Sequence, residues 1–112
     1  MLIDTHSHLN FIAYLADSDE TAKRALDENI WMINVGSQYT TSQRAVLMAE
    51  KYSEGVYSAV GLHPVHLSSI IFKDKVDENE EVEFQPSVED LDEEKYLKLA
   101  KSKKVVAIGE IG

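Results

Sequence analysis

The chain opens on the stretch MLIDTHSHLN, residues 1–10, in which a short apolar run ends in two histidines. The apolar residues predict a strand over Met1–Thr5, and His6 and His8 follow at its end. Side chains two residues apart share one face of a strand, so both imidazoles can reach one metal ion. Such a pair alone is a weak signal, and an incidental explanation stays equally open. Its position at the carboxyl end of a strand favours a site, because α/β proteins build their sites there.

Three further apolar runs predict strands, at Ile30–Val35, Val56–Gly61 and Val105–Ile108. All four runs are nearly continuous in apolar residues, which is typical of strands covered on both faces. Helical spacing of apolar residues lies between them, and it predicts helices over residues 17–29, 41–52 and 92–102. Strands that alternate with helices predict an α/β fold with a parallel sheet and right-handed crossovers.

An acidic segment at about residues 70–88 fits none of these patterns and is interpreted as a solvated insertion. A partner-binding loop is the alternative for it. Residues 74–94 hold eleven of the twenty acidic residues and a single base, Lys75. The net charge of −9 therefore belongs to one local segment. This acidity therefore does not argue against a polyanionic substrate. The chain also has no basic stripe that would indicate one.

The 112 residues suffice for one small domain with a core. No cysteine is present, which excludes disulfides and thiolate metal ligands. No apolar run approaches the roughly 20 residues of a membrane span. Polar residues interrupt the N-terminus too early for a signal peptide, so we expect a cytoplasmic protein without a membrane partner.

The predicted parallel sheet brings the polar residues at its strand ends together. His6 and His8 follow the first strand, His63 and His66 follow the third, and Glu110 follows the fourth between two glycines. In a parallel sheet these turns meet at one edge, so the histidines and the carboxylate are expected to converge. All four histidines of the chain lie at such turns.

Each of these positions also has a plainer interpretation. Asp4 is expected to hold an imidazole N–H, with a buried strand residue as the alternative. His63 could be a loop residue shaped by the following proline, although its neighbours favour a site. His66 is open between a site residue and a surface residue of the insertion. Asn34 and Ser37 are predicted to be turn residues, with contact to a phosphate as the lesser alternative.

The sequence resembles the TatD-like DNase family of metal-dependent hydrolases, within the wider amidohydrolase group. Four blocks carry the resemblance: IDTHSHLN at residues 3–10, NVGS at 34–37, AVGLHP at 59–64 and VVAIGEIG at 105–112. They arrive in family order and span the chain apart from the acidic insertion. Together they are highly specific, whereas the histidine pair alone is not.

The resemblance implies a TIM barrel whose divalent metal centre, in its complete form, holds two ions of Mg²⁺, Mn²⁺ or Zn²⁺. By it, His6 and His8 ligate one metal and Glu110 bridges to a second. His63 contacts the activated water or the substrate phosphate, which makes Glu110 and His63 the expected catalytic residues. Some family members have a second histidine directly after the proline. Here His66 stands one position later, and we predict that it binds substrate with His63.

The resemblance also implies hydrolysis of phosphodiester bonds in DNA. A related amide or ester substrate is one alternative, and a metal-binding half-barrel without catalysis is another. A complete barrel needs about 250 residues, so residues 1–112 are expected to form its N-terminal half. The first and fourth strands then expose free edges, which self-association or a C-terminal half would cover. With at most three metal ligands, this chain alone is expected to bind metal weakly and catalyse poorly.

Overall fold

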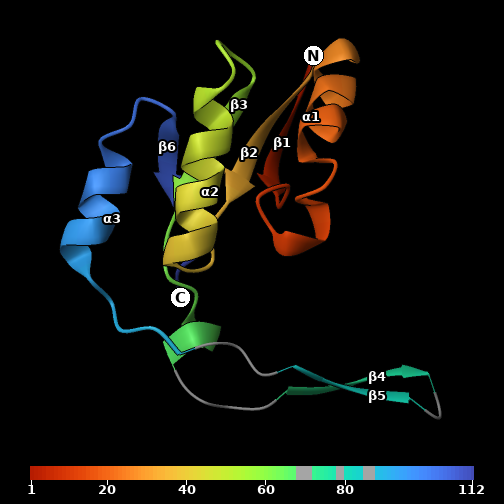
Figure 1. Ribbon diagram of the computed structural model, residues 1–112, viewed down its shortest axis with the longest axis vertical. Coiled ribbons are helices and arrows are strands. Elements are labelled where there is room, and N and C mark those ends of the chain that lie inside the picture. Colours follow the sequence, from red (N-terminus) through yellow and green to blue (C-terminus); the bar gives the residue numbers. More distant parts are fainter. Residues whose placement is uncertain (68–71, 78–79, 85–87) are drawn as a thin grey trace.

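The computed structural model of the protein describes residues 1–67, 72–77, 80–84 and 88–112. Its main sheet has four parallel strands in the order β1-β2-β3-β6 (Figure 1). The strands are Leu2–Ser7, Ile30–Val35, Val56–Val60 and Val105–Ile108. Each strand pairs with its predecessor in the sheet, without the reversal of a doubly wound fold. The predicted α/β class is confirmed, and the arrangement is that of four consecutive strands of a TIM barrel with the three helices between them.

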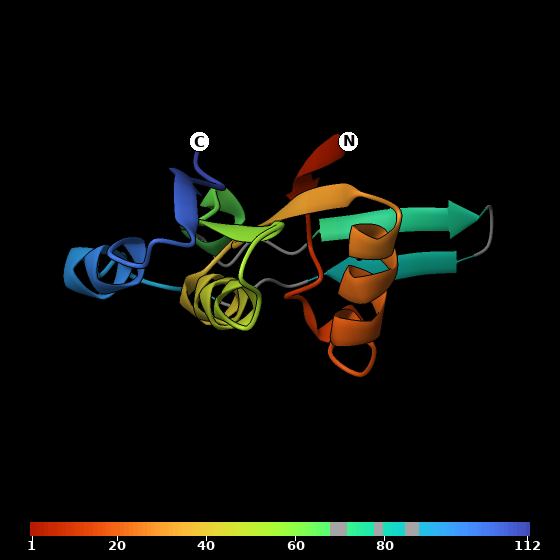
Figure 2. The same cartoon turned by 90° about the horizontal axis from the view of Figure 1, so that it is seen from above.

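Three α-helices connect these strands, and all lie along one face of the sheet (Figure 2). They are α1 (Ser18–Asp27), α2 (Tyr39–Glu50) and α3 (Glu93–Ala100). Two short 3₁₀ turns, Ile12–Tyr14 and Pro64–Leu67, follow β1 and β3. The predicted helices are therefore confirmed within a few residues. At α3 the Asp92 side chain accepts the Lys95 backbone N–H at 3.3 Å, so the acidic start acts as an N-cap.

Small apolar residues let α1 and α2 approach the sheet closely. Ala22 of α1 and Ala49 of α2 are completely buried, and they pack with Met32, Met48 and Val56 in the core. This is the helical face that the sequence spacing predicts. Within the described part of the chain, every helix is too short or too polar to cross a bilayer.

The expectation that all strands are covered on both faces is wrong. Leu2 and Ile3 of β1 are 69% and 50% exposed, and Val106 and Ile108 of β6 are 51% and 63% exposed. The reason is that the helices cover only one face, and β1 and β6 each have one neighbouring strand. The predicted free edges at the first and fourth strands are confirmed.

The acidic insertion contains secondary structure that the sequence interpretation missed. Phe72–Asp77 (β4) and Glu80–Phe84 (β5) form an antiparallel pair, separate from the main sheet. Their register places Lys73 opposite Glu83 and Lys75 opposite Glu81. In Figure 1 the pair extends from the end of the sheet where β1 and β2 finish. The remaining residues of the insertion, 70–71, 78–79 and 85–87, lie outside the described residues.

Beyond the insertion, the Glu89 side chain accepts hydrogen bonds from both α2 and α3. Its two carboxylate oxygens accept the Tyr39 backbone N–H at 3.2 and 3.0 Å, at the start of α2. The Tyr96 hydroxyl of α3 donates to the same carboxylate at 2.6 Å. Burial, aided by this hydrogen bond, raises the pKa of Tyr96, so its hydroxyl keeps the proton that it donates.

We expect Glu89→Ala to lower the free energy of unfolding by about 1–2 kcal/mol, because it leaves a helix N–H and a phenol without their acceptor. Urea denaturation followed by circular dichroism measures this loss. Asp90→Ala, at the exposed neighbouring carboxylate, is the control and should stay within about 0.5 kcal/mol of the parent. Equal losses in the two variants would contradict a specific role of Glu89.

Candidate metal centre

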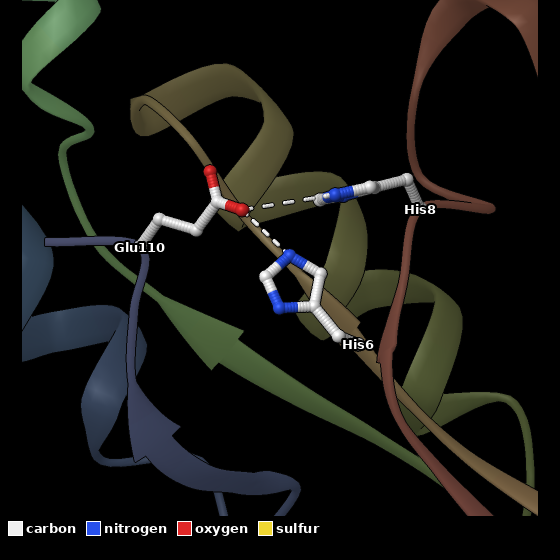
Figure 3. A group of neighbouring side chains, drawn as sticks. All are labelled: His6, His8 and Glu110. Carbon is white, nitrogen blue, oxygen red and sulfur yellow. Dashed lines mark hydrogen bonds and ion pairs between the residues drawn. The ribbon is translucent and has the colours of Figure 1, made fainter.

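Three side chains from the two edge strands converge at the carboxyl end of the sheet (Figure 3). His6 and His8 come from the end of β1, and Glu110 follows β6. Each offers one possible ligand atom, and these atoms all lie within 4.8 Å of one another. The convergence spans 104 residues of sequence and depends on the order of the parallel strands.

His8 has its ring fixed on both sides. Its Nδ1 lies 3.0 Å from the backbone carbonyl oxygen of Val35, and its ring stacks on Phe11 with centroids 4.2 Å apart. A carbonyl oxygen can only accept, so Nδ1 must carry the ring proton. In the neutral ring, Nε2 then presents a lone pair, and it lies 3.8 Å from Oε1 of Glu110. This is the tautomer that a metal-binding histidine needs.

His6 contacts Glu110 directly. Its Nε2 lies 2.6 Å from Oε1 of Glu110, the distance of a short, charge-assisted hydrogen bond. The ring stands edge-on to that of His8, with centroids 4.9 Å apart. The expected bond from Asp4 to an imidazole is not the contact observed, because the Asp4 carboxylate accepts the His6 backbone N–H at 3.0 Å. Asp4 is also exposed, so the alternative of a buried strand residue is wrong.

His63 faces the same carboxylate in the opposite tautomer. Its Nδ1 accepts the Val65 backbone N–H at 2.9 Å, so in the neutral ring the proton resides on Nε2. That Nε2 lies 3.7 Å from Oε2 of Glu110. His63 therefore presents a hydrogen-bond donor where His8 presents a lone pair. This difference is set by backbone contacts and is not visible in the sequence.

Three successive carbonyl groups at the carboxyl end of β2 hold these residues in place. The Val35 carbonyl accepts from the His8 ring, Gly36 accepts the Glu110 backbone N–H at 2.8 Å, and Ser37 accepts the His63 backbone N–H at 2.8 Å. Backbone carbonyls carry no sequence signature, and sequence reasoning therefore missed this role.

The two predicted turn residues differ in the structure. Ser37 does lie in the turn between β2 and α2, where its backbone N–H donates to Thr41 Oγ1 at 2.9 Å. For Asn34 the turn prediction is wrong, because this residue lies inside β2 and is completely buried. Its side chain bonds to neighbouring elements and has no exposed surface with which to reach a phosphate.

His66 lies in the 3₁₀ turn after β3 and is only 6% exposed, so the alternative of a surface residue is wrong. Its backbone N–H donates to the His63 carbonyl at 3.0 Å, and its own carbonyl accepts from Glu89 at 2.8 Å. His66 is not part of the His6–His8–Glu110 cluster. Substrate binding by His66 stays a prediction.

The donor set fits a divalent metal ion. Imidazole nitrogens suit zinc and other transition metals, whereas a carboxylate oxygen also suits Mg²⁺ and Mn²⁺. The side chains of His6, His8 and Glu110 are 55%, 31% and 25% exposed, so the cluster is open to solvent and to a substrate. Three ligands leave coordination positions for water or substrate, as catalytic metal sites require.

Comparison with known proteins shows the family of the chain. The family described as "TatD related DNase" matches residues 3–112. The chain is 39% identical over 113 residues to the "Uncharacterized metal-dependent hydrolase YabD" of Bacillus subtilis, covering all of this chain and 37% of that protein. It is 32% identical over 111 residues to the "Uncharacterized metal-dependent hydrolase YjjV" of Escherichia coli, covering 98% of this chain and 36% of that protein. The chain thus spans little more than a third of the length of these relatives. It belongs to the TatD-related DNase family.

Proposed function

We propose that this chain carries part of the active site of a metal-dependent hydrolase that cleaves phosphodiester bonds in DNA. The observation that carries the proposal is the convergence of His6, His8 and Glu110 at one edge of the sheet. The match to the TatD-related DNase family supports the nucleic-acid substrate. The cytoplasmic location expected from the sequence stays a prediction.

In this proposal His6 Nε2, His8 Nε2 and a Glu110 oxygen would hold the divalent ion. A bound divalent ion supplies a Lewis-acidic centre that activates water near neutral pH. His6 Nε2 and the Glu110 oxygen, which are joined by a hydrogen bond here, would both have to be deprotonated to hold the ion, since a metal ligand must be deprotonated. The Val35 carbonyl keeps His8 in its ligating tautomer throughout.

His63 has a different role, because its Nε2–H is a donor that faces Oε2 of Glu110, whereas His6 and His8 face Oε1. We assign to it a hydrogen bond to a non-bridging oxygen of the phosphodiester. That bond strengthens as negative charge grows on the phosphoryl oxygens in the transition state. The local acidity of residues 74–94 does not oppose a DNA substrate, since the rest of the chain is nearly neutral.

The experiment is Mn²⁺-dependent release of nucleotides from single-stranded DNA by this chain, with Mg²⁺ and Zn²⁺ in parallel. We expect slow release that EDTA stops and that Glu110→Gln lacks. A nitrophenyl ester and an N-acyl amino acid serve as the competing substrates. Hydrolysis of either of these without cleavage of DNA would replace the phosphodiester in the proposal.

We expect His63→Ala to lower kcat on DNA by about 100-fold, while the affinity for Mn²⁺ stays within about threefold of the parent. The reason is that His63 offers a donor rather than a lone pair to the site. Isothermal titration with Mn²⁺ and single-turnover cleavage measure the two effects separately. A loss of Mn²⁺ affinity comparable to that of His6→Ala would make His63 a ligand instead.

A further inference from the structure

A buried amide lies directly behind the histidine pair. Asn34 is completely buried in β2, and its Oδ1 accepts two hydrogen bonds from the end of β1. The donors are the Leu9 backbone N–H at 2.9 Å and the Ser7 hydroxyl at 3.0 Å. On the other side, Nδ2 contacts Met48 Sδ of α2 at 3.6 Å. One side chain thus connects the end of β1 to the helix layer.

These two donors are the residues on either side of His8. The amide oxygen of Asn34 therefore holds the backbone from which the His8 ring projects. The ring itself is anchored on the Val35 carbonyl, the residue next to Asn34 in β2. Asn34 therefore holds the backbone around His8, and Val35 holds its ring. The two residues are adjacent in β2.

The backbone pairing of β1 with β2 does not by itself fix the position of His6 and His8. The parallel pairing of β1 with β2 is regular from Leu2 to Asp4, and its register shifts before Ser7 pairs with Asn34. His6 lies inside this irregular stretch and His8 directly follows it. Where the ladder is interrupted, side-chain hydrogen bonds must take its place in fixing the backbone.

From these contacts we infer that Asn34 is a positioning residue, which holds His6 and His8 at the spacing needed to bind one cation. The inference rests on the proposed metal site and adds to it a residue that touches neither the ion nor the substrate. Partners of this kind typically change metal affinity by about 10- to 100-fold when they are removed.

The test compares Asn34→Leu with Asn34→Asp. Leu fills similar space and removes the acceptor, whereas Asp keeps an oxygen for Leu9 and Ser7. Co²⁺ titration followed by visible absorption reports affinity and ligand geometry together. We expect Asn34→Leu to weaken Co²⁺ binding by about 10- to 100-fold and to alter the spectrum, and Asn34→Asp to recover most of both.

A core substitution away from the site separates positioning from stability. Val56 is completely buried at the amino end of β3, whereas the metal site lies at the carboxyl end of the sheet. Val56→Ala should lower the unfolding midpoint without changing the Co²⁺ affinity or spectrum. Nitrogen-15 NMR of the cation-free chain gives a second readout. In Asn34→Leu the His8 ring should lose its single Nδ1–H tautomer, which Val56→Ala retains.

Wild-type Co²⁺ affinity, spectrum and His8 tautomer in a folded Asn34→Leu variant would overturn the inference. If that variant does not fold, Ser7→Ala removes one of the two donors without emptying the core, and it should still weaken Co²⁺ binding several-fold. Unchanged binding by Ser7→Ala, together with an unfolded Asn34→Leu, would make Asn34 a core residue only. If the parent chain binds no Co²⁺, the proposed function fails, while the NMR comparison still decides the role of Asn34.

Discussion

Glu110→Gln is expected to abolish cation-dependent hydrolysis and to weaken Mn²⁺ binding by at least about 100-fold. The carboxylate is the only anionic member of the His6–His8–Glu110 cluster, and a neutral amide removes the charge that attracts a divalent ion. The amide keeps nearly the same volume, so the helical content should not change. Isothermal titration with Mn²⁺ and far-ultraviolet circular dichroism measure the two quantities.

His6→Ala should match Glu110→Gln in both measurements, because His6 is a proposed ligand of the same ion. The control is Glu50→Gln, since Glu50 accepts a hydrogen bond from Ser102 at 3.0 Å and lies outside the cluster. It should leave Mn²⁺ binding unchanged. Loss of folding in both site variants would mean that His6 and Glu110 are structural and do not form a metal centre.

Gly61→Ala is expected to lower the free energy of unfolding by about 1–3 kcal/mol and to weaken Mn²⁺ binding together with it. A Cβ at residue 61 would lie 2.6 Å from the Gly109 carbonyl carbon and 2.7 Å from the Glu110 carbonyl oxygen. Both are backbone atoms, so neither can move without shifting the segment that carries Glu110. Gly61 therefore lets the end of β6 approach β3 closely.

Gly112→Ala is the matched control, because a Cβ there would meet only Pro64 Cγ at 3.5 Å, an ordinary contact. It should leave both quantities within the error of the measurement. Urea denaturation and Mn²⁺ titration of the two variants decide the prediction. An unchanged Mn²⁺ affinity in a destabilised Gly61→Ala would show that Glu110 tolerates the displacement, and would separate the fold from the site.

The main elements could be predicted because their signals are local. A run such as Ile30–Val35 is apolar over the length of one strand, and helical spacing of small residues such as Ala22 and Ala49 marks the faces that become the core. The β4–β5 hairpin was missed because the overall acidity of its segment obscured the alternation of Lys73 and Lys75 with acidic residues. Asn34 was misplaced because asparagine usually favours turns, a preference that burial and three polar contacts override here.

The sequence by itself determined that His6, His8, His63 and Glu110 lie at or shortly after the carboxyl ends of strands, since strand ends can be located from local patterns. Only the tertiary structure decided how these residues meet. The pairing of β1 with β2, of β2 with β3 and of β3 with β6 in one sheet sets the 2.6 Å contact between His6 and Glu110. Backbone groups set the two tautomers. The Val35 carbonyl makes His8 Nε2 a lone-pair donor, and the Val65 N–H makes His63 Nε2 a proton donor. Side-chain identity is local, whereas the position of a ligand atom depends on long-range packing and hydrogen bonds, which no short stretch of sequence encodes.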